Sequence, residues 1–364
     1  MYLQNAHMLS VLSFAKINLG LKIGPKRPDG FHELRTIYQT LALHDVIRVD
    51  LLPGSGIDIR CDDPRVPCDS SNTCYKVAER VLQTLPQGLK AAAPGDVRGA
   101  TEVAPLQNKV LITIEKRLPV QGGLGAASSN AVATMLAMQR ALGLDLAPAE
   151  RLRLAAEVGS DLPLFLIGGT VLGVGRGEEV YPIPDLPRLP VVVVTPPVGV
   201  STPKAFARWD EFYSGAALTA MGATGTIGEF GRSVFSWLSK SFPQASASPE
   251  WGKGPASGVP AAGGDRAETP LLDLVRAGIE NDFERVVFPE YPELREVKKL
   301  LLREGAQYAS LSGSGSTLYG LFASDSEARR AAELISAAGQ TAVATRTLTR
   351  AEYWKGILAA LASD

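Results

Sequence analysis

Apolar and polar positions alternate near the start of the chain, over residues 11–23. The odd positions in this stretch are Val, Ser, Ala, Ile, Leu, Leu and Ile, and the even positions include Lys16, Asn18 and Lys22. A period of two predicts a strand with one apolar face, so Lys16 and Asn18 should point the same way. The same pattern also fits solvent-facing residues on an edge strand, so the alternation alone assigns neither side chain a role.

Further segments show either the three-to-four spacing of a half-buried helix or short strand-like apolar runs. Helices are predicted over residues 72–85, 131–142, 148–158, 271–288, 292–303 and 326–338, with a loop at 200–206 that enters another helix. Strands are predicted over residues 36–51, 110–114, 170–174, 191–195, 307–311, 317–322 and 341–348. The order helix, strand, strand, helix, strand in the last part of the chain is typical of a ferredoxin-like α+β sheet covered on one face by helices.

Two stretches show no regular spacing of apolar residues. Residues 86–107 are rich in Ala, Pro and Gly, which favours a surface loop. Residues 215–268 are rich in Gly, Ala, Ser and Pro, with a few aromatic residues near 230–238 that would allow one helix. We expect residues 241–265 to be mobile, because they offer little apolar surface to offset the entropy of ordering them.

Composition narrows the class of protein without identifying a function. The chain has 364 residues, 45% of them hydrophobic and 21% charged, which is enough for two packed domains or one large one. The formal net charge of −1 gives no field that would recruit nucleic acid or an acidic membrane. The three cysteines lack paired spacing, which argues against a disulfide framework or a zinc site. We see no signal peptide and no apolar run of about 20 residues, so we expect a soluble cytoplasmic protein with neither a nucleic-acid nor a membrane partner.

A loop of small residues at 119–130 leads into a predicted helix. Its glycines Gly122, Gly123 and Gly125 allow a close backbone approach to a ligand, and the Ser-Ser-Asn at its end are N-cap residue types. The unpaired N–H groups and positive dipole end of a helix start suit a phosphate, although an ordinary strand–turn–helix joint is the alternative. No lysine follows Gly125 as a P-loop requires, and Ser128 stands where a dinucleotide fingerprint has its third glycine. A dinucleotide-dependent oxidoreductase is therefore not favoured.

Three other features carry weaker signals. Asp161 follows a glycine that ends a helix, so it is either a functional carboxylate or only the N-cap of the next short helix. Phe31 and His32 follow a turn-rich loop, where they suit either ring stacking or anchoring of the loop in the core. Residues 312–316 (Ser-Gly-Ser-Gly-Ser) form a second glycine loop, for which a plain hairpin turn is the alternative.

The order of these motifs along the chain resembles the GHMP kinase superfamily. The similarity lies in Lys16 and Asn18 on an early strand, the glycine loop at 119–130, the Gly-Ser-Asp-Leu-Pro at 159–163 and the loop at 312–316. It covers most of the chain, apart from residues 86–107 and 214–268. Ala-Lys-Ile-Asn-Leu at 15–19 and Asp-Gly-Phe-His at 29–32 are most similar to the superfamily members that phosphorylate the 2-hydroxyl of a cytidylated alcohol in the non-mevalonate isoprenoid pathway.

The resemblance implies an α+β fold of two domains with the active site in the cleft between them. The N-terminal ATP-binding domain, of the ribosomal protein S5 domain 2-like type, would span residues 1–185. A ferredoxin-like substrate-binding domain would span residues 186–364 and carry the low-complexity insert at about 214–268. The implied cofactors are ATP and Mg²⁺, the implied partner is a small-molecule substrate with a cytidine diphosphate group, and a monomer or weak homodimer is expected.

Site residues carry over position by position from this resemblance. Lys16 and Asp161 match the catalytic pair, in which Asp161 either takes the hydroxyl proton or orients the hydroxyl. The positions that match the ATP site are Asn72, Lys116, Pro119, Gln121, Gly122, Gly123, Leu124, Gly125, Ala126, Ala127, Ser128, Ser129 and Asn130. The positions that match the substrate site are Asn18, Phe31, His32, Thr202, Phe206, Gly313 and Ser314. Phe31, His32 and Phe206 would hold the cytosine ring, and the metal ligands stay unassigned.

Two other functions stay open on the sequence. One is a superfamily kinase for another small alcohol, of the mevalonate or homoserine type. Phe31, His32 and Phe206 argue against it, because those substrates carry no base to stack on. The other is a non-catalytic nucleotide-binding regulator, which would not need both Lys16 and Asp161. Phosphoryl transfer depends mainly on positioning and charge neutralisation, which a lysine–aspartate pair beside a glycine loop supplies.

Overall fold

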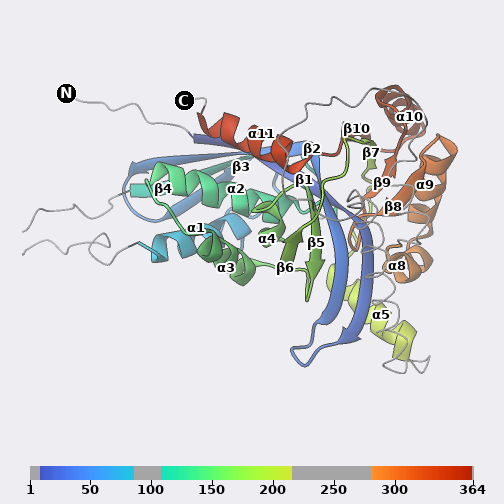
Figure 1. Cartoon of the computed structure of the whole chain (residues 1–364), viewed down its shortest axis with the longest axis horizontal. Coiled ribbons are helices and arrows are strands. Elements are labelled where there is room, and N and C mark those ends of the chain that lie inside the picture. Colours follow the sequence, from blue (N-terminus) through green and yellow to red (C-terminus); the bar gives the residue numbers. More distant parts are fainter. Residues whose placement is uncertain (1–8, 86–107, 121, 215–279, 363–364) are drawn as a thin grey trace, which may run out of the picture.

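Figure 1 shows the computed structural model of the chain, which describes residues 9–85, 108–120, 122–214 and 280–362. Four sequence-based predictions lie outside these residues. They are the surface loop at 86–107, the phosphate-loop residue Gln121, the insert from residue 215 to 268 and the first part of the helix at 271–288.

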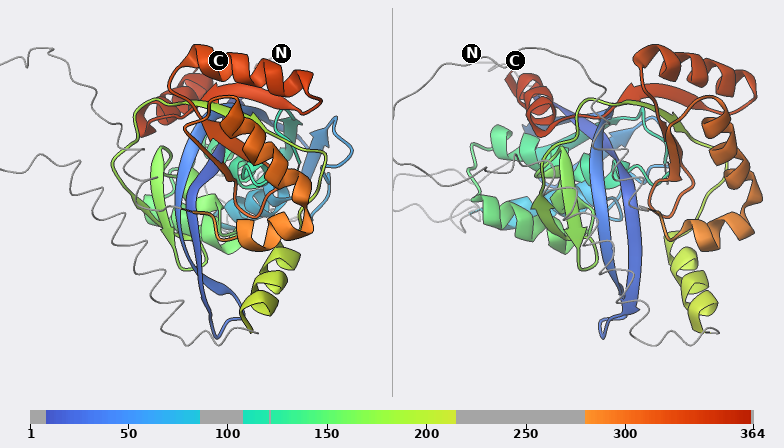
Figure 2. Two further views of the ribbon diagram at one scale, coloured as in Figure 1. Left: turned by 90° about the vertical axis from the view of Figure 1, so that its right-hand side faces the viewer. Right: turned by 45° about the vertical axis from the view of Figure 1, so that its right-hand side comes forward.

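One long hairpin forms the centre of the first sheet. Strands β1 (Leu9–Lys26) and β2 (His32–Pro53) run antiparallel, with Leu9 opposite Val49 and Lys26 opposite His32. The first sheet and its helices form the N-terminal lobe, and the second sheet and its helices form the C-terminal lobe. In Figures 1 and 2 the hairpin passes from the first lobe to the second and ends in a projecting tip. The alternating pattern at 11–23 therefore predicted β1 correctly, although the strand is longer at both ends.

The remaining strands of this sheet are shorter. Three helices pack against it, and a fourth, α3 (Pro148–Val158), packs on two of those helices. The strands are β3 (Ile57–Cys61), β4 (Asn108–Glu115), β5 (Thr170–Val174) and β6 (Glu179–Pro182), in the order β3-β4-β2-β5-β6. The helices are α1 (Thr73–Gln83), α2 (Ala126–Ala141), α3 (Pro148–Val158) and α4 (Leu162–Phe165). Buried residues of these elements, among them Val77, Ile112 and Met135, make one apolar core.

The last helix of the chain returns to this first core. Helix α11 (Arg350–Ala362) lies along β1 in Figure 1, and its Tyr353 and Ile357 are buried with Val11 and Phe14. The sequence patterns did not indicate this helix. The domain boundary at residues 185 and 186 stays a prediction.

The second sheet has the ferredoxin-like arrangement that the element order predicted. Its strands are β7 (Pro190–Val194), β8 (Tyr308–Leu311), β9 (Leu318–Leu321) and β10 (Ala342–Arg346), antiparallel in the order β10-β7-β9-β8. Helices α9 (Pro292–Arg303) and α10 (Asp325–Ala337) pack on it. Helix α8 (Glu284–Glu290) packs on α9, and α5 (Thr202–Ser214) packs on α8. The two-domain α+β fold class is therefore confirmed.

The predicted helix at 271–288 is wrong over its described part before Glu284. Residues 280–283 instead form a bridge and turn beside β1, where Leu21 N donates to Glu280 O at 3.0 Å and Asp282 N donates to Leu21 O at 2.9 Å. Asn281 Oδ1 also accepts from Phe283 N at 3.0 Å. Asn and Asp side chains that bond to nearby backbone compete with a helix, which explains the break.

A third core joins the two sheets and fixes the direction of the β1 side chains. Ala15, Ile17 and Leu19 are buried there with Val191 and Val193 of β7. Because side chains alternate along a strand, Lys16 and Asn18 lie on the opposite face of β1. The predicted common direction of these two polar residues is thereby explained by the packing between the lobes.

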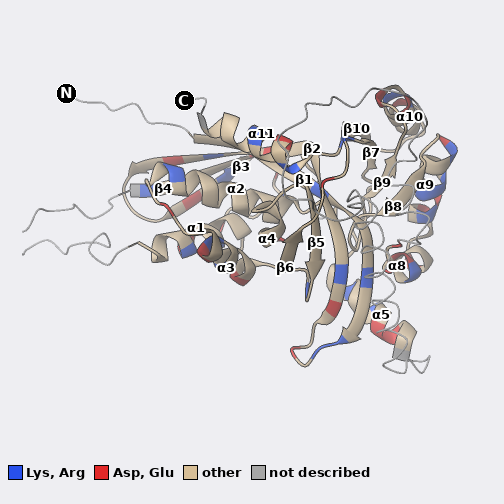
Figure 3. Ribbon diagram, viewed as in Figure 1, with Lys and Arg blue, Asp and Glu red and all other residues tan. Residues whose placement is uncertain are grey.

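Charges of both signs are interspersed along α8, α9 and α10 in Figure 3, in line with the net charge of −1. A mixed surface of this kind does not create a strong field of one sign.

Within the described residues, no helix has the length and apolar character needed to cross a membrane.

Candidate active site

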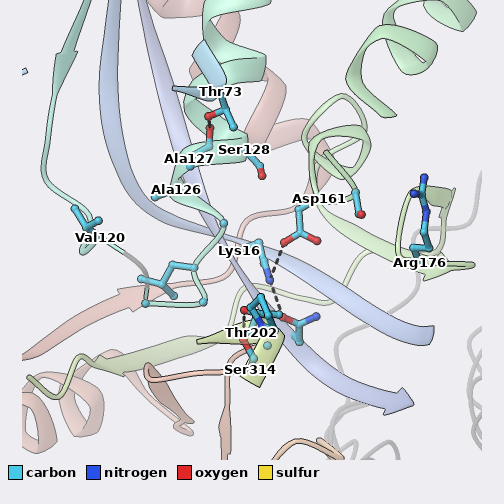
Figure 4. Close-up of a pocket in the computed structure, with 18 of the residues that line it drawn as sticks. Lys16, Thr73, Val120, Ala126, Ala127, Ser128, Asp161, Arg176, Thr202 and Ser314 are labelled. Carbon is cyan, nitrogen blue, oxygen red and sulfur yellow. Dashed lines mark hydrogen bonds and ion pairs between the residues drawn. The ribbon is translucent and has the colours of Figure 1, made fainter. Parts of the chain in front are cut away.

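A cavity of about 930 Å³ lies between the first sheet, the glycine loop and the second domain. Figure 4 shows part of its lining, with Lys16 and Asp161 at the centre, Val120 to one side and Arg176 to the other. Of the predicted site residues that the structure describes, Ser129 is absent from the lining and every other one is present. The sequence motifs, distant along the chain, thus meet at one place.

The glycine loop leads into α2 earlier than the sequence patterns indicated. Helix α2 begins at Ala126, and Gly125 occupies the N-cap with a left-handed φ of 69°. The prediction of Ser128, Ser129 and Asn130 as N-cap residues is therefore wrong, since all three lie within the helix. The early start was hidden because alanine and serine show no apolar period.

The first turn of α2 separates residues that face the cavity from residues that fix the helix. Ser13 Oγ donates to Asn130 Oδ1 at 2.5 Å and shares a hydrogen bond of 2.8 Å with Ser129 Oγ, so both side chains are turned toward β1. Ser128 is half-buried and lines the cavity. The first N–H groups of a helix have no partner within it, so the amides at 126–128 form an anion-binding start.

Gly125 allows this loop to lie directly on β1. Lys16 N donates to Leu124 O at 2.9 Å. A Cβ atom placed on Gly125 would lie 2.9 Å from both Lys16 Cγ and Phe165 Cζ. The close contact and the positive φ together require glycine at this position.

The second glycine loop joins β8 to β9 as a hairpin and also packs on the first loop. Ser312 Oγ donates to Gly123 O at 2.9 Å, and Thr317 N donates to Gly122 O at 3.1 Å. A Cβ atom placed on Gly313 would lie 3.7 Å from Lys16 Nζ. The hairpin reading is thus correct but incomplete, because this loop forms part of the cavity wall beside Lys16.

The Lys16 ammonium has a fixed position in the cavity. Lys16 Nζ donates to Asn18 Oδ1 at 2.8 Å and lies 3.3 Å from Asp161 Oδ2. Asn18 Nδ2 in turn donates to Thr36 Oγ1 at 2.7 Å, so both polar atoms of Asn18 are engaged. The Lys16 side chain is 4% exposed and that of Asp161 is 35% exposed, so the carboxylate is the open member of the pair.

Asp161 does not act as a helix cap. It occupies the N-cap position of α4, but its side chain makes no capping hydrogen bond. Tyr38 Oη instead donates to Asp161 Oδ1 at 3.3 Å. Burial, with the Asp161 charge next in importance, raises the pKa of Tyr38 well above its usual value, so the phenol keeps its proton and remains a donor.

Asn72 and Lys116 line the cavity, yet their polar atoms make structural contacts. Asn72 is the N-cap of α1, where its Oδ1 accepts from Cys74 N at 2.8 Å. Lys116 Nζ donates to Asp45 Oδ2 at 2.7 Å. Asp45 is fully buried and also accepts from Leu118 N and Asn130 Nδ2, so it fixes the entry and exit of the glycine loop. Sequence reasoning missed Asp45, whose one signal is an acidic residue inside an apolar strand.

The predicted cytosine-binding residues lie together on one part of the wall. The rings of His32 and Phe206 are stacked at a centroid distance of 5.1 Å and an interplanar angle of 8°. Phe31 is 52% exposed, and the Arg176 guanidinium lies 5.0 Å from its ring centroid. Thr202 Oγ1 and Ser314 Oγ share a hydrogen bond of 2.6 Å.

Two further residues near this wall were missed from the sequence. Asp210 lies one helical turn beyond Phe206 on α5 and contacts His32. Asn281 is buried before α8, and its Nδ2 donates to the carbonyl oxygens of Leu311 at 2.8 Å and Gly313 at 2.7 Å. Asn281 therefore holds the second glycine loop against the cavity. The spacing of Asp210 from Phe206 was a usable signal, whereas Asn281 lay inside a misassigned helix.

Comparison with known proteins gives matches in both halves of the chain. Residues 72–169 match the GHMP kinases N terminal domain, and residues 268–340 match the GHMP kinases C terminal domain. A 4-diphosphocytidyl-2-C-methyl-D-erythritol kinase of Solibacter usitatus is 33% identical over 91% of this chain and 86% of its own length. The enzyme of that name from Acaryochloris marina is 32% identical over 93% of each chain.

A solved structure agrees with these relatives. The crystal structure of a 4-(cytidine 5'-diphospho)-2C-methyl-D-erythritol kinase is 27% identical to this chain, has a TM-score of 0.63, and covers 93% of this chain and 99% of its own. The resemblance inferred from the motifs is thus confirmed. The chain belongs to the 4-diphosphocytidyl-2-C-methyl-D-erythritol kinase family of the GHMP kinases.

Proposed function

We propose that the protein transfers the γ-phosphoryl group of ATP to the 2-hydroxyl of 4-diphosphocytidyl-2-C-methyl-D-erythritol, a step of the non-mevalonate isoprenoid pathway. The observation that carries this proposal is the Lys16–Asp161 pair, 3.3 Å apart, which opens into the cavity beside the start of α2. The names of the relatives support the choice of substrate. We expect the enzyme to act in the cytoplasm as a monomer or weak homodimer.

Asp161 and Lys16 would act on the two reacting groups. The partly exposed Asp161 carboxylate is placed to orient the attacking hydroxyl and to accept its proton. Tyr38 and Lys16 hold that carboxylate from two sides, which leaves little freedom in its orientation. The buried Lys16 ammonium would stabilise negative charge that develops on the transferring phosphoryl group.

The start of α2 would bind the phosphates of ATP. The free amides at 126–128 and the Ser128 hydroxyl supply donors that need no rearrangement. Asp45 and Ser13 fix the helix from behind, through Asn130. This pre-ordered arrangement favours positioning as the source of catalysis, as phosphoryl transfer requires.

Mg²⁺ fits the donor set of this cavity. Among the described residues there is no group of three or more His, Cys, Asp or Glu side chains arranged for a metal ion. Mg²⁺ usually keeps several waters and takes one or two carboxylates together with substrate phosphates, so such a group is not required. The Ser128 hydroxyl would hold the ion together with the ATP phosphates and water, which leaves the Asp161 carboxylate for the attacking hydroxyl. When bound, the ion neutralises charge on the transferring group.

The aromatic wall supports a base-bearing substrate over mevalonate or homoserine. Phe31, His32 and Phe206 would hold the cytosine. Thr202, Gly313 and Ser314 also line the cavity and would make further contacts with the substrate. A small alcohol without a base would leave the aromatic surface unused. A non-catalytic regulator is likewise not favoured, because Lys16 and Asp161 form the ion pair that the proposed phosphoryl transfer needs.

The test is ATP consumption by the purified protein with Mg²⁺ and each of three alcohols. We expect rapid turnover with the cytidylated alcohol and turnover near background with mevalonate or homoserine. Equal kcat/KM values for all three would contradict the proposed substrate. ATP binding without consumption in every case would support the regulator.

A further inference from the structure

His32 and Asp210 make a short contact between the two lobes. His32 Nε2 lies 2.7 Å from Asp210 Oδ1, although the residues belong to β2 and α5 and are 178 positions apart. The His32 side chain is 6% exposed, and both residues line the cavity. Lys26 Nζ lies 3.1 Å from the other carboxylate oxygen. The two oxygens of Asp210 are thus each engaged by a nitrogen of the β1–β2 hairpin.

The contacts of Asp210 determine which nitrogen of His32 carries a proton. Partial burial alone would raise the pKa of Asp210, but hydrogen bonds from Lys26 and His32 outweigh it and lower the pKa below its usual value. The carboxylate is then ionised at neutral pH and accepts hydrogen bonds without donating any. Nε2 of His32 must therefore carry a proton, and in the neutral form of an imidazole this leaves a lone pair on Nδ1.

The stack of His32 on Phe206 determines where a base would meet this lone pair. Nearly parallel rings with centroids 5.1 Å apart are offset, so His32 covers part of the Phe206 face. A base stacked on the rest of that face would lie in the plane of the imidazole and present its edge to it. Ring stacking and edge recognition would then act on the same base.

We propose that Asp210 is a positioning residue that selects cytosine over uracil by holding His32 with Nδ1 as a hydrogen-bond acceptor. The inference rests on the proposed function, because it assumes that the substrate carries a pyrimidine. Cytosine has an amino group at position 4, which donates to an acceptor. Uracil has a carbonyl oxygen there, which faces the Nδ1 lone pair without a hydrogen bond. The pairing therefore discriminates between two bases of almost the same shape.

The test compares wild type with Asp210→Asn, with Glu211→Gln as the matched control. Asparagine keeps the size of the side chain but can either accept from or donate to Nε2, which releases the tautomer of His32. Glu211 neighbours Asp210 on α5, and its side chain is 64% exposed. Glu211→Gln should therefore leave kcat/KM unchanged with both substrates. The measured quantity is the ratio of kcat/KM for the cytidylated alcohol to that for its uridylated counterpart, at saturating ATP.

We expect Asp210→Asn to reduce this ratio at least about tenfold, equivalent to about 1.4 kcal/mol. The KM for ATP and the melting temperature should stay close to the wild-type values, which a merely structural role for Asp210 would not allow. An unchanged ratio in Asp210→Asn would overturn the inference. A wild-type preference for the uridylated substrate would also overturn it, because Nδ1 would then be a donor.

Two further measurements separate this inference from the proposed function. If wild type does not phosphorylate the cytidylated alcohol, the proposed function fails, and calorimetric binding of CDP and UDP decides the inference alone. Tighter binding of CDP that is lost in Asp210→Asn would support it, and equal binding of both nucleotides to wild type would contradict it. If the variant does not fold, the imidazole ¹⁵N shifts of wild-type His32 decide, with a proton on Nε2 expected and a proton on Nδ1 alone refuting it.

Discussion

Gly125→Ala tests whether close packing of the glycine loop places the Lys16 ammonium. The new Cβ atom would lie 2.9 Å from Lys16 Cγ, 3.1 Å from Lys16 Cε and 2.9 Å from Phe165 Cζ. These distances are below the roughly 3.5–4.0 Å of a favourable carbon–carbon contact. Lys16 or the loop must therefore move by about half an ångström. The φ of 69° adds a separate backbone term of about 1–2 kcal/mol for a residue with a Cβ.

Both effects have measurable consequences. The free energy of unfolding should fall by about 1–2 kcal/mol from the backbone and by about 1–3 kcal/mol more from overpacking. A misplacement of about 1 Å lowers a rate by about 10²-fold, so a shift of half that size should lower kcat about tenfold. The KM for the alcohol should change less, because the nearest atoms that the new Cβ would meet belong to Lys16 and Phe165 and not to the aromatic wall.

Gly143→Ala is the matched control for this variant. Gly143 has a φ of 63°, and a Cβ atom placed there meets nothing within 4 Å. The variant Gly143→Ala should lose the same backbone term, about 1–2 kcal/mol of unfolding free energy, with kcat unchanged. Urea unfolding and steady-state kinetics of both variants give the comparison. If Gly125→Ala keeps the kcat of Gly143→Ala, the loop does not place Lys16 and the reasoning is refuted.

Four further variants extend the account. Asp161→Asn should lower kcat at least ~10²-fold with little change in either KM, and near-normal kcat in a kinetic assay would exclude a role in chemistry. Phe206→Ala should raise the KM for the cytidylated substrate about 5- to 150-fold, from ~1–3 kcal/mol of lost stacking, with the ATP KM unchanged. Because Phe206 also packs on Phe283, a melting curve must accompany those kinetics, and loss of stability alone would refute a base contact. Asn281→Leu should lower kcat and remove about 1–3 kcal/mol of unfolding free energy, measured in urea, because two buried carbonyls lose their donor. Replacing residues 241–265 with a short Gly-Ser linker should leave kcat unchanged, and an inactive folded product would show that the insert contributes to the site.

The spacing of apolar residues along the chain predicted those helices and strands whose buried side chains recur at a regular interval. The alternation at 11–23 identified β1 and the shared direction of Lys16 and Asn18, because one face of the strand packs between the lobes. The helix at 148–158 was predicted at its observed bounds, since Pro148 and Gly159 mark its ends. The start of α2 was missed because its first turn is made of alanine and serine, which carry no period.

Contacts between distant segments could not be predicted in the same way. Asp45 and Asp210 act through residues that are 71 to 178 positions away, and no local spacing signals such pairs. Asp161 had two readings on the sequence, and only its approach to Lys16 and Tyr38 separates them. The site therefore followed from the order of whole motifs, whereas the residues that hold those motifs required the three-dimensional structure.

The central claim is that the cavity directs one phosphoryl group to one hydroxyl of a cytidylated alcohol. The most direct measurement is ³¹P NMR of the product formed from that alcohol and ATP with Mg²⁺. We predict a single new phosphomonoester on the 2-hydroxyl, one for each ATP consumed, with the diphosphate signals retained. Phosphate on another hydroxyl, or release of inorganic phosphate at the same rate without the alcohol, would contradict the account.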